Sequence, residues 1–121
     1  MQYMLLIYLD ENSLSEVERA KCYQDSAGFA RQLHMRHQYV SAAPLYPTSS
    51  AKSVRVKNGK TMVTDGPFAE THEQLGGFFL IEADSIEKAT EIASKIPAGQ
   101  WGTVEVRPVL QVEGLPNAAS A

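Results

Sequence analysis

The sequence predicts an α+β sandwich, in which two helices pack on one face of an antiparallel sheet. Three patterns support this prediction. Two apolar runs, Tyr3–Tyr8 and Phe78–Ala83, have the length and composition of buried strands. Each run is followed by a segment in which apolar residues recur at helical spacing. Between these two halves, Asn58-Gly59 separates two alternating segments, which is typical of a tight β-hairpin.

The composition is that of one globular domain of 121 residues, with 44% hydrophobic residues, 21% charged residues and a net charge of -3. The basic residues are scattered, so no basic face for direct contact with nucleic acid is expected. Cys22 is the single cysteine, which excludes an intrachain disulfide and fits a reducing compartment. The apolar start lacks a basic leader region and is too short to span a bilayer, so we expect a cytoplasmic protein without membrane contact.

The first half of the chain predicts a strand, a helix and a second strand. Tyr3–Tyr8 is expected to be a central strand covered on both faces. Ser13 and Glu16 have the spacing of a capping box, at the start of a helix that runs from about Leu14 to about Met35. Gln38–Tyr46 follows as a strand, and its prolines place it at a sheet edge or turn.

One stripe of the first helix is rich in alanine and is expected to approach the sheet closely. Its members are Ala20, Tyr23, Ala27, Ala30 and His34, with Val17 and Leu33 at the margins. Tyr23 is expected in the core, with a polar partner for its hydroxyl. Cys22 lies to one side of the stripe and has no predicted role.

The second half begins with a hairpin and ends with a strand, a helix and a strand. Asn58 and Gly59 both tolerate the positive φ of a type I′ turn between Ser53–Lys57 and Lys60–Thr64. The later elements are a buried strand at Phe78–Ala83, a helix from Ile86 to about Ile96 capped by Asp84 or Ser85 and ended by Pro97–Gly99, and a strand at Thr103–Val109. Residues 114–121 are expected to be a frayed tail.

This element order predicts a ferredoxin-like sandwich with an extra hairpin, in a single domain over residues 1–113. Helices on one side of a four-stranded sheet leave the other side bare. Apolar residues of Tyr3–Tyr8 and Phe78–Ile81 must point to that bare side as well as to the helices. We therefore expect a second copy to pack there, giving a homodimer.

Chemistry is most concentrated between Thr64 and Phe79. Asp65 and Glu70 are candidate catalytic residues, because two neighbouring carboxylates can raise a pKa into the range used for proton transfer. The alternative is structural: Asp65 in Asp65-Gly66-Pro67 bonds backbone amides of a turn, and Glu70 is a solvated side chain. Phe68 is expected either as a core side chain or as a stacking surface for a ligand.

The remaining candidates also have two interpretations each. Gly76-Gly77 is either a bulge in the strand or a place where a ligand approaches the backbone. His34 is a candidate ligand-binding residue at the rim of a cleft between helix and sheet, and His37 is expected to help terminate the helix. The two histidines lack a third ligand at recognisable spacing, so no metal site is expected. The sequence has no phosphate-binding glycine loop, nucleophile elbow or dinucleotide fingerprint, so no cofactor is expected.

The run Thr64–Thr71, followed by Glu73–Phe78, resembles the signature of the DGPF group of YCII-related proteins. Met4–Tyr8 and Val104–Pro108 support the resemblance, which covers about residues 1–113. It implies a fold of the dimeric α/β-barrel type, related to muconolactone isomerases and chlorite-dismutase-like proteins. No activity is established for the group, and some members are encoded beside extracytoplasmic-function sigma factors.

Two departures from the family pattern limit what the resemblance implies. Other YCII relatives carry a His–Asp pair whose Asp precedes the proline that ends the second helix. Ile96 stands at that place, before Pro97, so this pair is not assigned here. His72 stands where the group usually has lysine or arginine, which argues against a permanent positive charge in the motif.

Two functions from different classes follow. The first is binding of a small organic ligand in a cleft lined by Phe68, Tyr23, His34 and Arg107, with cofactor-free acid/base chemistry by Asp65 or Glu70. The alternative is a non-enzymatic regulatory module whose partner is a sigma-factor-type protein. The sequence names neither the ligand nor the partner.

Overall fold

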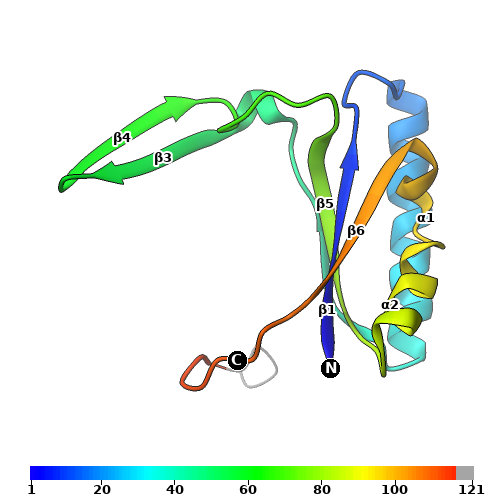
Figure 1. Ribbon diagram of the computed structural model, residues 1–121. Coiled ribbons are helices and arrows are strands. Elements are labelled where there is room, and N and C mark those ends of the chain that lie inside the picture. The colour runs from blue at the N-terminus through cyan, green and yellow to red at the C-terminus, as the bar shows by residue number, and fades with distance from the viewer. Residues whose placement is uncertain (117–121) are drawn as a thin grey trace.

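The computed structural model describes residues 1–116 of the chain. Strands and helices alternate in the predicted order, with a hairpin inserted in the middle (Figure 1). The elements are β1 (Gln2–Leu9), α1 (Glu16–Met35), β2 (Tyr39–Pro44), a 3₁₀ turn (Thr48–Ser50), β3 (Lys52–Lys57), β4 (Lys60–Asp65), β5 (Gln74–Glu82), α2 (Ile86–Ala93), a 3₁₀ turn (Pro97–Trp101) and β6 (Gly102–Pro108).

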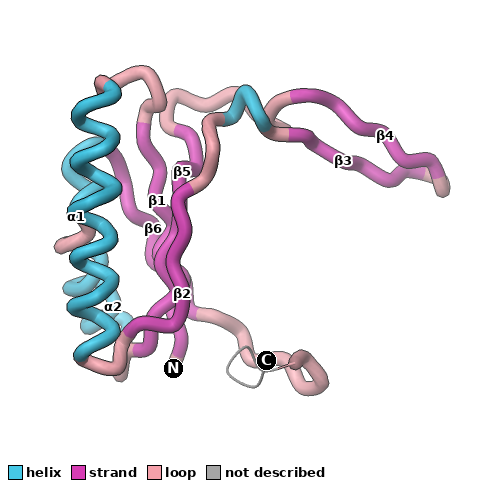
Figure 2. Tube along the Cα trace, turned by 180° about the vertical axis from the view of Figure 1, so that it is seen from behind, coloured by secondary structure: helices cyan, strands magenta, loops and turns pink. Residues whose placement is uncertain are grey.

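Four strands form one antiparallel sheet in the order β2-β5-β1-β6, and β3 and β4 form a separate two-stranded sheet. Both helices lie on the same face of the larger sheet, as Figures 1 and 2 show from opposite sides. The predicted ferredoxin-like α+β fold with an extra hairpin is therefore confirmed. β2 is an edge strand, as its prolines predicted.

The two faces of β1 differ in burial. Tyr3, Leu5, Ile7 and Leu9 are buried, and the residues between them are only half-buried. Leu5 pairs with Phe79 of β5, and Phe79 contacts Phe29 of α1, so the buried residues of both strands lie on the helix side. Within the described chain the helices cover one face of β1 and leave the other open, so cover of the second face, expected from a second copy, stays a prediction.

The first helix begins later than predicted. Its capping box is formed by Ser15 and Glu18: the Ser15 hydroxyl accepts a hydrogen bond from the Glu18 amide at 3.1 Å, and the Ser15 amide donates to the Glu18 carboxylate at 2.9 Å. The predicted Ser13–Glu16 pair does not form. The Ser13 hydroxyl instead donates to the Asp10 carbonyl at 2.7 Å, within the turn before the helix.

The buried stripe of α1 lies one residue earlier along the chain than the predicted alanine stripe. Cys22 and Leu33 are buried, and Phe29 packs against the core between them. Ala27 and His34, both on the predicted stripe, are exposed. Alanine contributes little apolar area, so the larger Phe29 and Leu33 side chains decide which side of the helix faces the sheet.

The end of α1 is a Schellman motif. His37 has a φ of 59°, its amide donates to the His34 carbonyl at 3.1 Å, and the Gln38 amide donates to the Leu33 carbonyl at 2.9 Å. His37 therefore occupies the left-handed position that usually holds glycine. The prediction that His37 helps terminate the helix is confirmed.

The glycine-containing turns also match their predictions. Asn58 and Gly59 have φ of 51° and 75°, as a type I′ turn requires. At the start of β5, Ile7 pairs with Gly77 and Tyr8 with Leu75, so Gly76 is the extra residue of a β-bulge. Residues 114–116 form the end of the described chain, and the rest of the predicted frayed tail, 117–121, lies outside the described residues.

Candidate functional site

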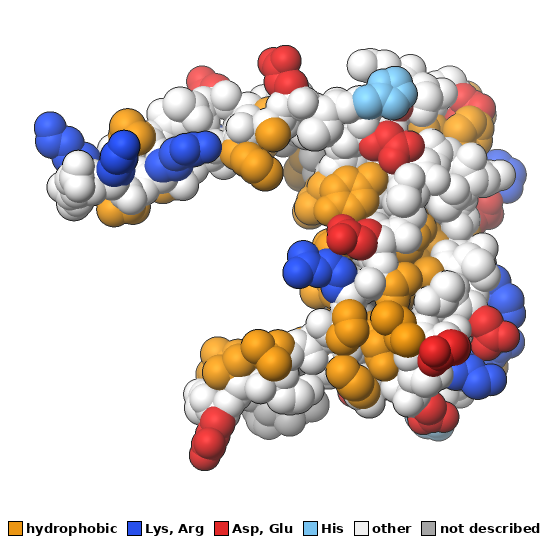
Figure 3. Space-filling view, in the orientation of Figure 1, with side chains coloured by type: hydrophobic (Ala, Val, Ile, Leu, Met, Phe, Trp, Pro, Cys, Tyr) orange, Lys and Arg blue, Asp and Glu red, His pale blue; other side chains and the backbone are white. Residues whose placement is uncertain are grey.

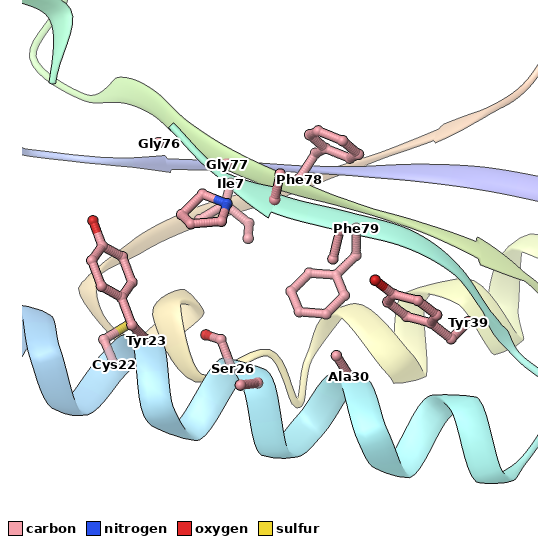
Figure 4. Close-up of a pocket in the computed structure, with 14 residues that line it drawn as sticks. Ile7, Cys22, Tyr23, Ser26, Ala30, Tyr39, Gly76, Gly77, Phe78 and Phe79 are labelled. Atoms are coloured by element: carbon pink, nitrogen blue, oxygen red, sulfur yellow. The ribbon is translucent and has the colours of Figure 1, made fainter. Parts of the chain in front are cut away.

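A cavity of about 400 Å³ lies between α1 and the edge of the sheet formed by β2 and β5 (Figure 4). Each wall includes small residues, which leave space between the helix and the sheet. The helix contributes Ala27 and Ala30, and the edge strand contributes Ala42, which pairs with Phe79 on the helix side of the sheet. The large core side chains that hold helix and sheet together, Leu5, Leu33 and Ile81, do not line the cavity, so a gap remains beside them.

Three hydroxyl groups lie on this otherwise apolar lining. Tyr23 and Tyr39 lie toward opposite ends of the cavity, and Ser26 points from α1 toward the sheet between them (Figure 4). Phe79 forms part of the floor, and its ring is held edge-on by Phe29, with centroids 5.8 Å apart. Among the described lining residues there is no carboxylate, lysine or histidine. The cavity therefore offers apolar contact and hydroxyl hydrogen bonds to a bound molecule.

Cys22, a buried cysteine with a free thiol, also lines the cavity. Burial raises the pKa of this thiol, because the surrounding apolar atoms solvate a thiolate poorly. The side chain is accordingly a neutral thiol at physiological pH. It is suited to packing against an apolar ligand more than to nucleophilic attack.

The glycine pair Gly76-Gly77 closes the cavity at the start of β5. A Cβ at Gly77 would lie 2.8 Å from the Ala43 carbonyl oxygen, so glycine is required for β2 to approach β5 here. A Cβ at Gly76 would make ordinary contacts, with the Leu9 side chain at 3.6 Å and the Ile7 carbonyl oxygen at 3.9 Å. Of the two interpretations of the pair, the bulge is confirmed. The two glycines also line the cavity.

The carboxylates predicted for catalysis lie away from this cavity. Asp65 ends β4, where its side chain is 85% exposed and pairs with Lys52. Glu70 is exposed in the loop between β4 and β5. β4 runs from the tip of the hairpin back toward the four-stranded sheet, so Asp65 and the following loop lie at the base of the hairpin, before β5 (Figure 1). Neither carboxylate lines the cavity, and their catalytic role stays a prediction.

Of the four predicted ligand-binding residues, Tyr23 alone lines the cavity. It is 45% exposed, so its expected place in the core was wrong. Phe68 is 83% exposed, which contradicts the core interpretation of this residue. His34 is exposed in the last turn of α1, edge-on to Tyr39 at 6.3 Å. Arg107 lies on β6 opposite Met4, on the face of the sheet turned away from the helices.

Ser26, Tyr39 and Ala42–Ala43 line the cavity and were not among the predicted site residues. The alanines of α1 were predicted to pack closely against the sheet, whereas Ala27 and Ala30 border the cavity. The signal available was the combination of small residues on two elements predicted to be neighbours, Ser26–Ala30 and Ser41–Ala43. Small residues facing one another across a layer leave space unless larger side chains enter it.

In residues 1–116, no group of three or more His, Cys, Asp or Glu side chains lies close enough together to hold a metal ion. Within the same range, no helix is long and apolar enough to cross a membrane.

Comparison with known proteins gives a consistent picture. The YCII-related domain matches residues 1–113. An uncharacterized protein of Rhizobium meliloti is 36% identical over 114 residues, which cover 90% of this chain and 92% of that protein. The fold is similar to that of 5-chloro-2-hydroxyhydroquinone dehydrochlorinase from Burkholderia phenoliruptrix, solved in complex with 2,5-dihydroxybenzoquinone. The TM-score is 0.56 at 16% identity, over 93% of this chain and 97% of that one.

The dehydrochlorinase comparison concerns the fold, since its sequence identity is low. The match to the YCII-related domain and the alignment with the Rhizobium relative each cover nearly the whole described chain. The chain belongs to the YCII-related family.

Proposed function

We propose that this protein binds a small, mainly apolar organic molecule, about the size of one aromatic ring, in the cavity between α1 and the β2–β5 edge. The observation that carries the proposal is the cavity itself: about 400 Å³ with an apolar lining and a few placed hydroxyls. Protein sites for small molecules have this size and character. Tyr23 and Ser26 would donate hydrogen bonds to oxygen atoms at the edge of the ring.

A further support comes from the structural relative. That protein was solved with 2,5-dihydroxybenzoquinone, a single ring carrying oxygen atoms. A molecule of the same general shape suits the arrangement of apolar walls and hydroxyl groups described for this chain. This comparison supports the class of ligand, and the reaction of the dehydrochlorinase is not proposed for this chain.

The test uses phenol as the probe, followed by amide chemical shifts of the ¹⁵N-labelled protein. Shifts are expected at lining residues such as Ser26, Ala43 and Gly77, and they should saturate with phenol concentration. Ser26→Phe would place a ring inside the cavity and abolish these shifts. Gln24→Phe, on an exposed position of the same helix, is the matched control and should bind as the parent does. Saturating shifts that survive in Ser26→Phe would locate the ligand elsewhere and refute the proposal.

The single cysteine supplies an independent readout. Cys22 lines the cavity, so bound phenol should slow its alkylation by iodoacetamide. The same protection should be lost in Ser26→Phe. Alkylation that is indifferent to phenol at concentrations that saturate the amide shifts would contradict the cavity as the binding site.

Cofactor-free acid/base chemistry by Asp65 or Glu70 stays a prediction. The exposed Lys52–Asp65 ion pair contributes little to stability, so Asp65→Asn should change the free energy of unfolding by less than about 1 kcal/mol. Phenol affinity in the folded variant then decides whether this carboxylate acts at the cavity. Equal affinity in Asp65→Asn and the parent would remove Asp65 from the ligand site, and Glu70→Gln is tested in the same way.

We also propose that the protein forms a homodimer through the open face of the sheet. Met4 and Leu6 of β1 pair with Leu80 and Phe78 of β5, and all four lie on the face opposite the helices. Figure 3 shows hydrophobic side chains on the floor of a hollow that is flanked by the hairpin and the C-terminal segment. An apolar face of this kind is commonly covered by a second copy in symmetric dimers.

Leu80→Asp should shift the protein to the monomer in sedimentation equilibrium. Ile86→Asp changes a partly exposed apolar residue on α2, away from this face, and should leave the association unchanged. A parent protein that is monomeric at all accessible concentrations would refute the dimer. Association with a sigma-factor-type protein stays a prediction, tested by recovery of such a partner with the tagged protein from cell extract.

A further inference from the structure

Beyond the Lys52–Asp65 ion pair at its base, the hairpin β3–β4 has an apolar face and a cationic face. Its register pairs Val54 with Val63 and Val56 with Thr61, so the three valines lie on one face. The alternate pairs are Arg55 with Met62 and Lys57 with Lys60, which place three cations on the other face. This period-two pattern is that of a sheet with one side buried and one side in water.

The apolar face of the hairpin has no cover within the described chain. Val54, Val56 and Val63 are 61%, 70% and 56% exposed. β3 and β4 hydrogen-bond to each other and not to the four-stranded sheet, and the pair projects from the body (Figures 1 and 2). An isolated two-stranded hairpin is marginally stable at best in water. Its valines therefore need a surface to pack against.

We propose that the hairpin is a clasp: its valine face closes over a second copy of this chain that is seated on the open face of the sheet. The clasp rests on the proposed homodimer and adds to it a second, separate contact surface. The hairpin projects on the side of the sheet opposite the helices, which is the side where the second copy would lie (Figure 1).

The length of the hairpin fits this arrangement. Strands of six residues are roughly 20 Å long, and facing sheets pack roughly 10 Å apart. A hairpin that starts at one sheet thus extends past the sheet of the second copy and along its side. In a two-fold dimer each copy both gives and receives one hairpin, so no hairpin is left without a surface.

Charge favours a second copy as the surface that is covered. Residues 52–65 contain four cations (Lys52, Arg55, Lys57 and Lys60) and one anion (Asp65), a net charge of +3. The whole chain has 11 cations and 14 anions, so the remainder holds seven cations and thirteen anions, a net charge of -6. A cationic hairpin is attracted to an anionic body of its own kind, and complementary charge of this sort speeds and orients association.

The test compares two changes on opposite faces of the hairpin. Val54→Thr/Val56→Thr keeps the β-branched shape and makes the proposed contact polar, whereas Met62→Thr changes the cationic face. Because the double change enters a symmetric dimer twice, it should raise the dimer dissociation constant by at least roughly tenfold. Met62→Thr should raise the constant by less than about threefold. Equal effects of the two variants would overturn the clasp.

Hydrogen exchange separates failure of the clasp from failure of the dimer. Amides of residues 52–65 should be protected where the parent is dimeric and exchange faster on dilution or in Leu80→Asp. A stable dimer whose hairpin amides exchange at the monomer rate would overturn the clasp and leave the dimer standing. A protein that is monomeric throughout would refute both, and hairpin protection in that monomer would point to cover from the chain itself.

Discussion

Replacement of Gly77 by alanine tests how tightly the edge strand β2 is held against β5. The added Cβ would lie 2.8 Å from the Ala43 carbonyl oxygen and 3.2 Å from the Pro44 Cα. Both atoms belong to the backbone, so relief requires β2 to move as a strand. That movement strains the hydrogen bond from the Leu45 amide to the Gly76 carbonyl, now 2.8 Å. Overpacking of this kind costs about 1–3 kcal/mol.

Gly76→Ala is the matched control. Its new Cβ would meet the Leu9 side chain at 3.6 Å, an ordinary contact, and both substitutions reduce the freedom of the unfolded chain equally. The difference in unfolding free energy between the two variants therefore isolates the clash, and we expect Gly77→Ala to be less stable by about 1–3 kcal/mol. For a domain of this size, a 1 kcal/mol change lowers Tm by about 3 °C or more.

The assay is guanidinium denaturation followed by fluorescence of Trp101, the single tryptophan of the chain, which is half-buried beside the core. Both variants are measured at one protein concentration, because any association makes apparent stability depend on concentration. Equal midpoints with equal slopes would show that β2 yields without cost. The close approach of β2 and β5 would then not be the reason for glycine at this position.

Three further outcomes are expected. His37→Gly should raise the unfolding free energy by about 1 kcal/mol, because glycine adopts the left-handed helix end without strain, while Arg36→Gly, next to it, should lower stability in the same thermal melt. Ser15→Ala should cost about 1 kcal/mol and Ser13→Ala clearly less, and a reversed order in chemical denaturation would contradict the assigned capping box. Burial raises the pKa of the Cys22 thiol in the folded protein. The buried neutral thiol therefore contributes its full stabilisation below the unfolded pKa of about 8.5, and this stabilisation is lost as the pH rises through the folded pKa. The parent should therefore lose stability relative to Cys22→Ala as the pH rises above about 8.5, and parallel pH profiles of the two proteins would refute this.

Local signals in the sequence were sufficient for the fold. The long apolar runs, the Asn58-Gly59 pair and the prolines near β2 each act within a few residues, and each predicted the element that is observed. The N-terminus of α1 was misplaced because Ser13 and Ser15 both have an acidic residue three positions later. The sequence pattern alone does not decide between two such capping boxes.

The candidate site was harder to predict because it is a cavity that forms where small side chains leave space. Charged and aromatic residues drew attention to Asp65, Glu70 and Phe68, but these side chains are exposed at the base of the hairpin and in the loop before β5. The cavity depends instead on where α1 is rotated and how far it stands from β2. Both the rotation of α1 and its distance from β2 depend on packing between elements that are distant in the sequence. An alanine in the sequence predicts neither of them.

The walls of this cavity have a consequence for how binding preference could change within the same scaffold. Ala27, Ala30 and Ala42 each leave room that one extra methyl group or one larger side chain would occupy. Since Leu5, Leu33 and Ile81 form the fully buried core elsewhere, such substitutions would reshape the space without removing the side chains that stabilise the fold. Ligand size and outline could thus be altered one position at a time, with the strands, helices and caps left as they are.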